Sequence, residues 1–309
     1  MPRILVAGEA LMDCIPLPDD AFRPIVGGSP FNVAVAAARL GRPAGTGIGF
    51  MSGVSTDFFG DRLMRALHAE GIDTAWVARL DAPTTLAFVD LSGPSPRYAF
   101  YDEKSATRSF TTHAIPELPG AARFVHVGSV SLIGAPGADE IAQMAHAAAA
   151  VGRVVCVDPN VRASLVANDP AWRPRINGLL EIASVVKLSD EDLETLEPGM
   201  APADFAARTL AGGASLVIVT GGGAGAEAWT PTGHAHVTAP KIVVADTIGA
   251  GDTLMAATLV HLAEHGLDSR ASIAALDASA MTDLLTFATR AAAVTCTRAG
   301  CNPPLRHEV

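Results

Sequence analysis

Apolar residues gather in short runs of strand length, and Ala-rich segments of helical length separate most of these runs. The runs predict buried strands at 3–7, 45–50, 123–127, 153–157, 184–188 and 215–219. Buried strands that alternate with helices are typical of a parallel sheet covered by helices on both faces. Because no polar linker and no repeat of fixed period interrupts this pattern, we expect one α/β domain over residues 1–309.

Two segments depart from the alternation, at about 11–26 and 84–103, because they carry β-branched and aromatic residues. The second contains a turn-forming run, Ser-Gly-Pro-Ser-Pro at 92–96, which predicts a hairpin. We expect the two segments to form a small β lid over a ligand crevice. A plain extension of the sheet edge is the alternative.

A helix is predicted over 29–41, with Ser29 as its N-cap. Gly27 and Gly28 precede it, and glycines allow the main chain to approach a ligand closely. Asn32 lies in the first turn of this helix, where its amide can face the same ligand.

The strongest chemical signal is Asp-Thr-Ile-Gly-Ala-Gly-Asp at 246–252, which we expect to lead from a strand into an amphipathic helix. Free N–H groups of the first helical turn and the helix dipole make Gly249, Ala250 and Gly251 an anion pocket suited to phosphate. Asp252 in the same turn is placed to accept the proton of a hydroxyl that attacks a phosphoryl group. The alternative is a tight turn with Asp252 as a helix cap.

A second glycine-rich turn, at 220–225, follows a buried strand. The sequence has no GxxxxGK[ST] motif, so a P-loop does not hold a nucleotide. Part of this turn is similar to the dinucleotide fingerprint GxGxxG, which requires a helix to follow. Residues 229–233 instead predict a strand and a turn, which disfavours a nicotinamide or flavin site.

Together, the segments 27–41 and 246–252 resemble the two signatures of the ribokinase-like (PfkB) carbohydrate kinase family. Other short motifs occur in the family's order, at 8–13, 158–162, 187–192 and 220–225. Within the family, the chain is most similar to bacterial fructokinases. The resemblance implies a three-layer αβα sandwich with a mostly parallel central sheet and a small β lid. It also implies transfer of the γ-phosphoryl group of ATP to a sugar hydroxyl, with Mg²⁺ and K⁺.

The resemblance further implies roles for single residues. Asp252 matches the catalytic base, and Gly249, Ala250 and Gly251 match the anion hole. The expected sugar-binding residues are Asp13, Gly27, Gly28, Asn32, Phe100 and Arg162. The expected nucleotide-binding residues are Lys187, Asp190, Thr220, Gly222 and Gly225. The carboxylate of Asp246 and the carbonyl of Ile248 resemble a monovalent-cation loop.

The sequence departs from the family at one motif. Many members carry NxxE for the Mg²⁺ and phosphate network, whereas this chain has Lys-Leu-Ser-Asp at 187–190. Lys187 can place a point charge against ATP phosphates, and the alternative is a surface lysine that caps the next helix. Apart from Asp190, the acids at 190–194 are expected to be a solvated first helical turn.

Acidic residues after the lid aromatics bear on the choice of sugar. Asp102 and Glu103 would repel a carboxylated sugar and favour a neutral hexose, most simply fructose, although Lys104 and Arg108 lie close in sequence. The alternatives are a 2-keto-3-deoxygluconate, ribose or nucleoside kinase. An alternative of another class is a non-catalytic regulator that binds sugar or nucleotide.

Charge and cysteine usage exclude other classes. The net charge is −10 and the chain has three lysines, so nucleic acid is not an expected partner. No stretch of 18 apolar residues suggests a membrane span, and the four cysteines form no CxxC pair, so we expect a cytoplasmic protein. A lid edge could pair with a second copy, which makes a homodimer plausible. His-Leu-Ala-Glu-His at 261–265 fits a zinc pattern, but only one glutamate, Glu308, remains downstream as a further ligand, so we disfavour it.

Overall fold

The computed structural model describes residues 1–18, 20–90, 97–114 and 116–309. Within these ranges the main sheet has nine strands in the order β13-β12-β11-β10-β9-β8-β1-β4-β5. Neighbouring strands are parallel except at β11-β12-β13, which form an antiparallel edge. The strands are β1 (Ile4–Ala7), β4 (Ile48–Ser55), β5 (Asp73–Leu80), β8 (Phe124–Gly128), β9 (Val154–Asp158), β10 (Val185–Ser189), β11 (Leu216–Thr220), β12 (Ala226–Thr230) and β13 (Gly233–Val237).

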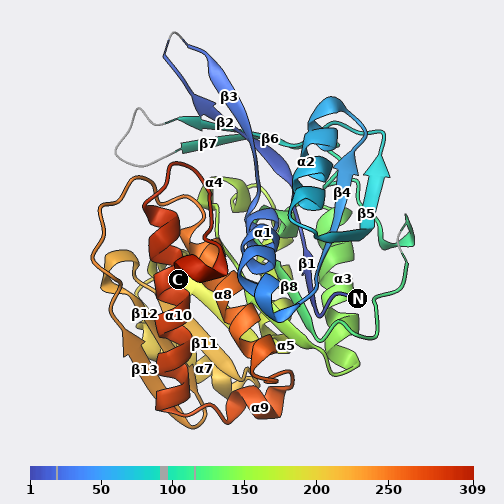
Figure 1. Cartoon of the computed structure of the whole chain (residues 1–309). Coiled ribbons are helices and arrows are strands. Elements are labelled where there is room, and N and C mark those ends of the chain that lie inside the picture. The colour runs from blue at the N-terminus through green and yellow to red at the C-terminus, as the bar shows by residue number, and fades with distance from the viewer. Residues whose placement is uncertain (19, 91–96, 115) are drawn as a thin grey trace.

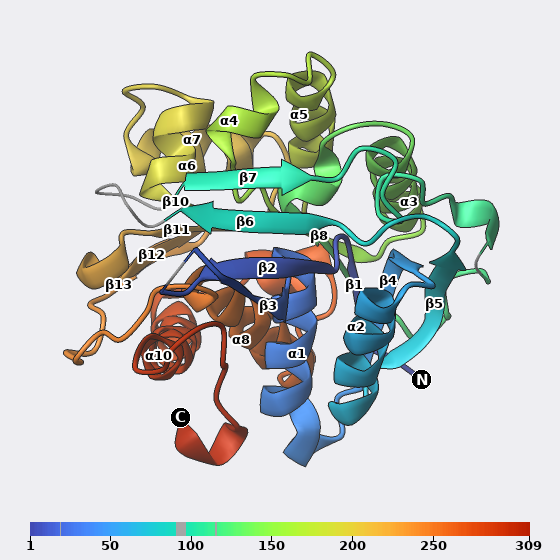
Figure 2. The same ribbon diagram turned by 90° about the horizontal axis from the view of Figure 1, so that it is seen from above.

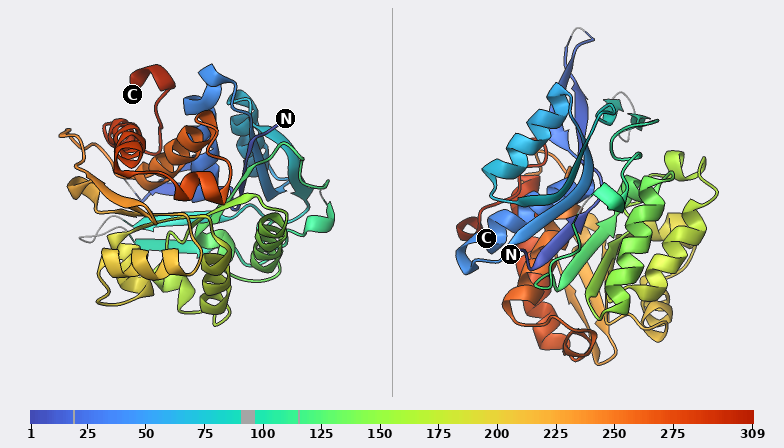
Figure 3. Two further views of the ribbon diagram at one scale, coloured as in Figure 1. Left: turned by 90° about the horizontal axis from the view of Figure 1, so that it is seen from below. Right: turned by 90° about the vertical axis from the view of Figure 1, so that its right-hand side faces the viewer.

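Helices cover both faces of this sheet, as the view from below shows most clearly (Figure 3). One face carries α1 (Ser29–Gly41), α2 (Phe58–Ala69), α8 (Ala250–Glu264) and α10 (Ala278–Cys296). The other carries α3 (Gly137–Ala150), α5 (Trp172–Ile182), α6 (Asp190–Leu196) and α7 (Pro202–Ala211). Shorter helices are α4 (Ala163–Val166), α9 (Arg270–Ala274), η1 (Arg42–Ala44), η2 (Thr112–Ala114), η3 (Ser129–Leu132), η4 (Gly222–Ala224) and η5 (Arg306–Glu308). The expected three-layer αβα arrangement is confirmed.

A second, four-stranded sheet stands on one end of the sandwich (Figures 1 and 2). Among the described residues its order is β3-β2-β6-β7, with β2 parallel to β6 and the other pairs antiparallel. Its strands are β2 (Leu11–Pro16), β3 (Phe22–Gly27), β6 (Leu86–Asp90) and β7 (Arg97–Tyr101). Because β2 follows β1 after three residues, the small sheet begins at the carboxyl end of a central strand. The turn predicted at 92–96 lies outside the described residues.

The hydrophobic pattern located the interior strands well, and its errors have physical causes. All six predicted strands are present, although β4 begins at Ile48 rather than 45. The expected strand before Asp246 is absent, and Val243 there is 89% exposed. The helix α8 is not amphipathic, because it lies between α1 and α10 and is buried almost all round.

The start of α1 also differs from the expectation. Gly28, with φ 106°, is the N-cap, and Ser29 is the first helical residue, with no side-chain cap at this end. The Ser29 hydroxyl is therefore available to a partner on another element. In the parts of the chain that the structure describes, no helix combines the length and apolar character needed to cross a bilayer.

Asp57 joins α2 to the small sheet. One carboxylate oxygen accepts hydrogen bonds from the amide of Gly60 (2.7 Å) and the hydroxyl of Thr84 (2.7 Å). The other accepts from the amide of Thr84 (2.9 Å), two residues before β6. Burial opposes the charge, but these bonds outweigh it and lower the pKa of Asp57.

We predict that Asp57→Ala lowers the free energy of unfolding at pH 7 by about 1–2 kcal/mol, because a helix cap and the Thr84 bonds are lost. A carboxylate whose pKa is lower in the folded than in the unfolded state stabilises the folded protein at pH values above its unfolded pKa. This stabilisation is lost as the pH falls and the carboxylate becomes protonated. The difference from the wild type should therefore shrink below about pH 4. Urea denaturation at several pH values measures it, and a difference independent of pH would contradict this account.

Candidate functional site

The amino end of α8 forms an anion-binding corner. The first main-chain bond of the helix runs from the amide of Thr253 to the carbonyl of Gly249 (2.8 Å). The amides of Gly251 and Asp252 come before this bond, at the end of the helix where N–H groups point outward and the dipole is positive. This corner therefore suits the oxygens of a phosphoryl group.

Two glycines are required at this corner for different reasons. Gly249 has φ 80°, and a Cβ atom there would lie 2.2 Å from Sγ of Cys301. A Cβ atom on Gly251 would lie 2.9 Å from Nζ of Lys187. The glycines thus allow both the turn and the close approach of a lysine ammonium to the helix end.

The carboxylate of Asp252 is buried, with 7% of the residue exposed, and is held on both oxygens. The Ser29 hydroxyl donates to Oδ1 (2.7 Å), and Nδ2 of Asn32 donates to Oδ2 (2.9 Å). Burial raises the pKa of Asp252, whereas these two bonds and the charges of Lys187 and Arg162 lower it. Each oxygen still has a lone pair free to accept from a further hydroxyl.

Asp13 lies on the lid side of the same site. A Cβ atom on Gly27 would lie 2.1 Å from Oδ2 of Asp13, so the carboxylate lies against bare main chain. The pKa of Asp13 is raised to about 6, chiefly by burial and then by the charge of Asp252, while the charge of Arg162 opposes the rise. The structure therefore brings Asp13, Arg162 and Asp252 within electrostatic reach of one another, as expected.

Aromatic side chains of β7 lie on the same side of the site as Asp13. The guanidinium carbon of Arg162 lies 5.8 Å from the ring centre of Tyr98, and the rings of Tyr98 and Phe100 are 6.0 Å apart. Phe100 was expected here from the sequence, whereas Tyr98 was not. Strand alternation could have found it, because residues two apart point to the same face of a sheet.

Lys187 and Asp158 form a buried ion pair beneath the anion-binding corner. Their side chains are 4% and 1% exposed, and Nζ lies 2.8 Å from Oδ2. Burial opposes both charges, yet the carboxylates around Lys187 raise its pKa, and the pKa of Asp158 rises only to about 6. The surface-lysine alternative is therefore wrong, whereas contact with nucleotide phosphates stays a prediction.

The acids after Lys187 divide into two environments. Asp190 lies at the start of α6, and one of its oxygens is 3.7 Å from where a Cβ atom on Gly221 would be, beside the glycine-rich turn. Asp192, expected to be solvated, is instead buried and accepts from the amides of Val161 (2.6 Å) and Ser189 (3.0 Å). The capping-box spacing from 189 to 192 was the signal that could have revealed it.

The remaining expected groups are also in place. The turn from Thr220 closes with a bond from the Gly221 amide to the Gly225 carbonyl (2.9 Å), and the hairpin β12-β13 follows it, as predicted. Gly222 begins η4 within this turn. Asp246 accepts from the amides of Ile248 (3.0 Å) and Gly300 (2.9 Å), which fixes its loop.

Metal chemistry built on side-chain clusters finds no support in the described ranges. No group of three or more His, Cys, Asp or Glu side chains is arranged there to hold a metal ion. His261 and His265 stack on each other, with ring centres 4.0 Å apart. The role of Asp246 and the Ile248 carbonyl toward a monovalent cation stays a prediction.

Comparison with known proteins agrees with this geometry. The sequence model described as pfkB family carbohydrate kinase matches residues 1–308. A fructokinase of Rhizobium leguminosarum bv. trifolii is 36% identical over 282 residues, which cover 90% of this chain and 85% of that protein. A fructokinase of Klebsiella pneumoniae is 32% identical over 277 residues, covering 88% of each.

Solved structures give the same result. A fructokinase from Xylella fastidiosa with bound ATP has a TM-score of 0.88 and 31% identity, covering 97% of this chain and 94% of that one. A fructokinase from Vibrio cholerae O395 in fructose, ADP and calcium ion bound form has a TM-score of 0.83 and 26% identity, with the same coverage. These matches confirm the expected ribokinase-like fold and class of enzyme. The chain belongs to the pfkB family of carbohydrate kinases.

Proposed function

We propose that the protein is an ATP-dependent fructokinase. The observation that carries this proposal is the buried carboxylate of Asp252, fixed by Ser29 and Asn32 in the turn that presents the anion-binding amides of α8. A base and an anion hole in one helical turn are what phosphoryl transfer to an alcohol requires. The relatives named fructokinases support the choice of sugar.

The residues divide the chemistry between them. Asp252 accepts the proton of a sugar hydroxyl as that oxygen bonds to the γ-phosphorus and the bond to the leaving oxygen of ADP breaks. The N–H groups of Gly249, Ala250 and Gly251 stabilise the charge on the transferred group. ATP with Mg²⁺ supplies the phosphoryl group and neutralises part of its charge. The protein contributes mainly position and electrostatics, because such transition states are loose.

The proposed substrate and cofactor sites are assigned from the positions of the polar and charged groups. The sugar lies against Asp13, Asn32 and the main chain of Gly27 and Gly28, under the aromatic side chains of β7 and beside Arg162. The nucleotide lies along the turn 220–225, near Asp190, whose oxygen ligands suit Mg²⁺. Lys187 underlies the phosphates. Asp246 and the Ile248 carbonyl supply oxygen ligands for K⁺.

We propose that residues 1–309 form one kinase domain. Within this domain, the small sheet, formed by about 11–26 and 84–103, acts as a lid. Its inner face carries Tyr98 and Phe100, which lie beside Arg162. We place the enzyme in the cytoplasm, because ATP is available there and because its four cysteines are free thiols.

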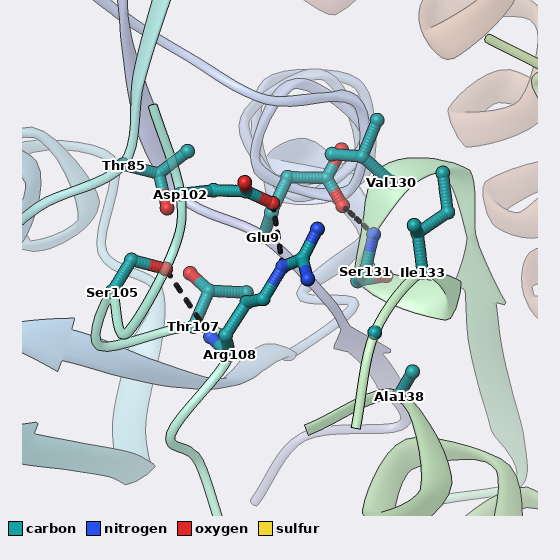
Figure 4. Close-up of a pocket in the computed structure, with 11 residues that line it drawn as sticks. Glu9, Thr85, Asp102, Ser105, Thr107, Arg108, Val130, Ser131, Ile133 and Ala138 are labelled. Carbon is teal, nitrogen blue, oxygen red and sulfur yellow. Dashed lines mark hydrogen bonds and ion pairs between the residues drawn. The ribbon is translucent and has the colours of Figure 1, made fainter. Parts of the chain in front are cut away.

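The choice of a neutral sugar gains support from the Asp102–Arg108 pair. Nε of Arg108 lies 2.7 Å from Oδ2 of Asp102, and the side chains are 29% and 17% exposed. Both residues line a small cavity next to Glu9 (Figure 4). The charge of Arg108 is therefore neutralised within the protein rather than offered to a sugar carboxylate, which supports a neutral sugar.

The first prediction from the proposed function is that Asp252→Asn reduces kcat with fructose by about 10²–10⁴-fold, because the base is lost. Coupled measurement of ADP release tests it, with circular dichroism to confirm folding. Asp204→Asn, at an exposed position on α7, is the matched control. Near-wild-type turnover of Asp252→Asn would contradict the mechanism.

The same assay tests the sugar when fructose, ribose, 2-keto-3-deoxygluconate and adenosine are compared with and without K⁺. Fructose binding by the wild type without ADP formation would instead support a regulator.

The second prediction concerns Asp102→Ala, which frees the guanidinium of Arg108. The preference for fructose over 2-keto-3-deoxygluconate, as a ratio of kcat/KM, should fall about tenfold, because an unpaired arginine attracts the carboxylate. Asp61→Ala is the matched control, since it breaks an Asp–Arg pair of equal length, 2.7 Å, elsewhere. An unchanged ratio would refute the specificity argument.

The third prediction is a homodimer through the lid. Phe22, Phe88 and Tyr101 form a row on the face opposite Phe100, with ring centres 5.0 Å and 5.5 Å apart. Phe22 is 45% exposed and Tyr101 is 66% exposed, which is typical of a covered interface. The edge strands β3 and β7 could add pairing with a second copy.

Sedimentation velocity of the wild type should give a dimer, and Phe22→Ser with Tyr101→Ser should give a monomer. Phe58→Ser on α2 removes a residue that is 68% exposed and should leave the dimer intact. A monomeric wild type, or a dimeric double variant, would overturn the lid interface.

A further inference from the structure

Glu9 is a buried carboxylate that has no part in the mechanism above. It lies between β1 and β2 and is 1% exposed. Oε1 accepts from the amide of Ser29 (3.1 Å), and Oε2 accepts from the amide of Ser131 (3.0 Å). Figure 4 shows the second of these contacts. One carboxylate thus fixes the starts of two elements, α1 and η3.

The contact with Ser29 leads directly to the proposed base. The amide of Ser29 is held by Glu9, while its hydroxyl donates to Oδ1 of Asp252 (2.7 Å). The preceding residue lies against Glu9 as well, since a Cβ atom on Gly28 would lie 2.7 Å from the Glu9 carbonyl oxygen. The main chain at 28–29 cannot shift without disturbing one of these contacts.

Only a carboxyl group at the reach of a glutamate side chain accepts both hydrogen bonds. The two amide donors belong to residues 102 positions apart in sequence, and each needs its own acceptor oxygen. Glutamine offers one acceptor and would turn its N–H₂ group toward the other donor. Aspartate also has two carboxyl oxygens but is one methylene shorter, so it reaches one donor at most. Loss of either bond leaves a buried N–H unsatisfied, and loss of the bond from the Ser29 amide loosens Ser29.

We propose that Glu9 is a positioning residue for Asp252, acting through the main chain of Ser29. Its effect on turnover rests on the proposed function. Its effect on the Asp252 carboxyl does not, because the hydrogen bond from Ser29 is present whatever the substrate.

The experiment follows the titration of Asp252 by ¹³C NMR of aspartate-labelled protein, with Asp252→Asn to assign the signal. The bond from Ser29 lowers the pKa of Asp252, so Ser29→Ala should raise it. Glu9→Asp should raise it in the same direction, and the double variant should show no further rise. Glu140→Gln is the control, since Glu140 also accepts from a main-chain amide, that of Thr112 (2.8 Å), far along the chain from Ser29.

Kinetics supply the second measurement. Glu9→Asp and Ser29→Ala should each lower kcat about tenfold with a smaller change in KM, and their effects should not multiply. A merely structural Glu9 would lower the melting temperature and leave the pKa of Asp252 and the acid limb of the pH profile unchanged, which would overturn the proposal.

Two further outcomes, a variant that does not fold and a wild type that does not phosphorylate fructose, can each be told apart from failure of this proposal. If Glu9→Asp does not fold, Glu9→Gln compared with and without Ser29→Ala gives the same information, because an effect routed through Ser29 disappears when its hydroxyl is absent. An equal effect of Glu9→Gln in both backgrounds would refute the proposal. If the wild type fails to phosphorylate fructose, the proposed function fails, while the NMR titration still tests the link from Glu9 to Asp252.

Discussion

The structure depends on the two hydrogen bonds that join the start of α1 to the start of α8. Ser29 and Asn32 lie one turn apart on α1 and hold the two oxygens of Asp252. The amino ends of these two helices therefore meet at one point, and their positive ends face the same corner. Asp13 of the small sheet and Lys187 of the main sheet both lie near this point.

Burial and charge balance each other around this point. Three carboxylates, those of Asp13, Asp158 and Asp252, all have pKa values raised by burial. Arg162 lowers the pKa values of Asp13 and Asp252, and Lys187 lowers those of Asp158 and Asp252. In the proposed mechanism, a base kept dry in this way reacts with the bound alcohol rather than with bulk water, and a neighbouring ammonium stabilises the transferred charge.

Sequence and structure agree most closely where chemistry is encoded locally. The segment 246–252 predicts the glycine turn and the helix start that the structure has, because glycine conformation and helix polarity act within a few residues. The missed features depend on distant segments. Ser29 was expected to cap its own helix, and its partner Asp252 is more than two hundred positions away. Asp192 looked solvated in a run of acids, yet it accepts a hydrogen bond from the amide of Val161, in the loop between β9 and α4. No local pattern shows that α8 is enclosed between two helices.

The most direct test is a crystal structure with fructose and a non-hydrolysable ATP analogue. The account predicts the acceptor hydroxyl oxygen within about 2.6–3.2 Å of an Asp252 oxygen, with the terminal phosphate against the amides at 249–251. A terminal phosphate bound away from the start of α8, or a sugar hydroxyl directed away from Asp252, would contradict it.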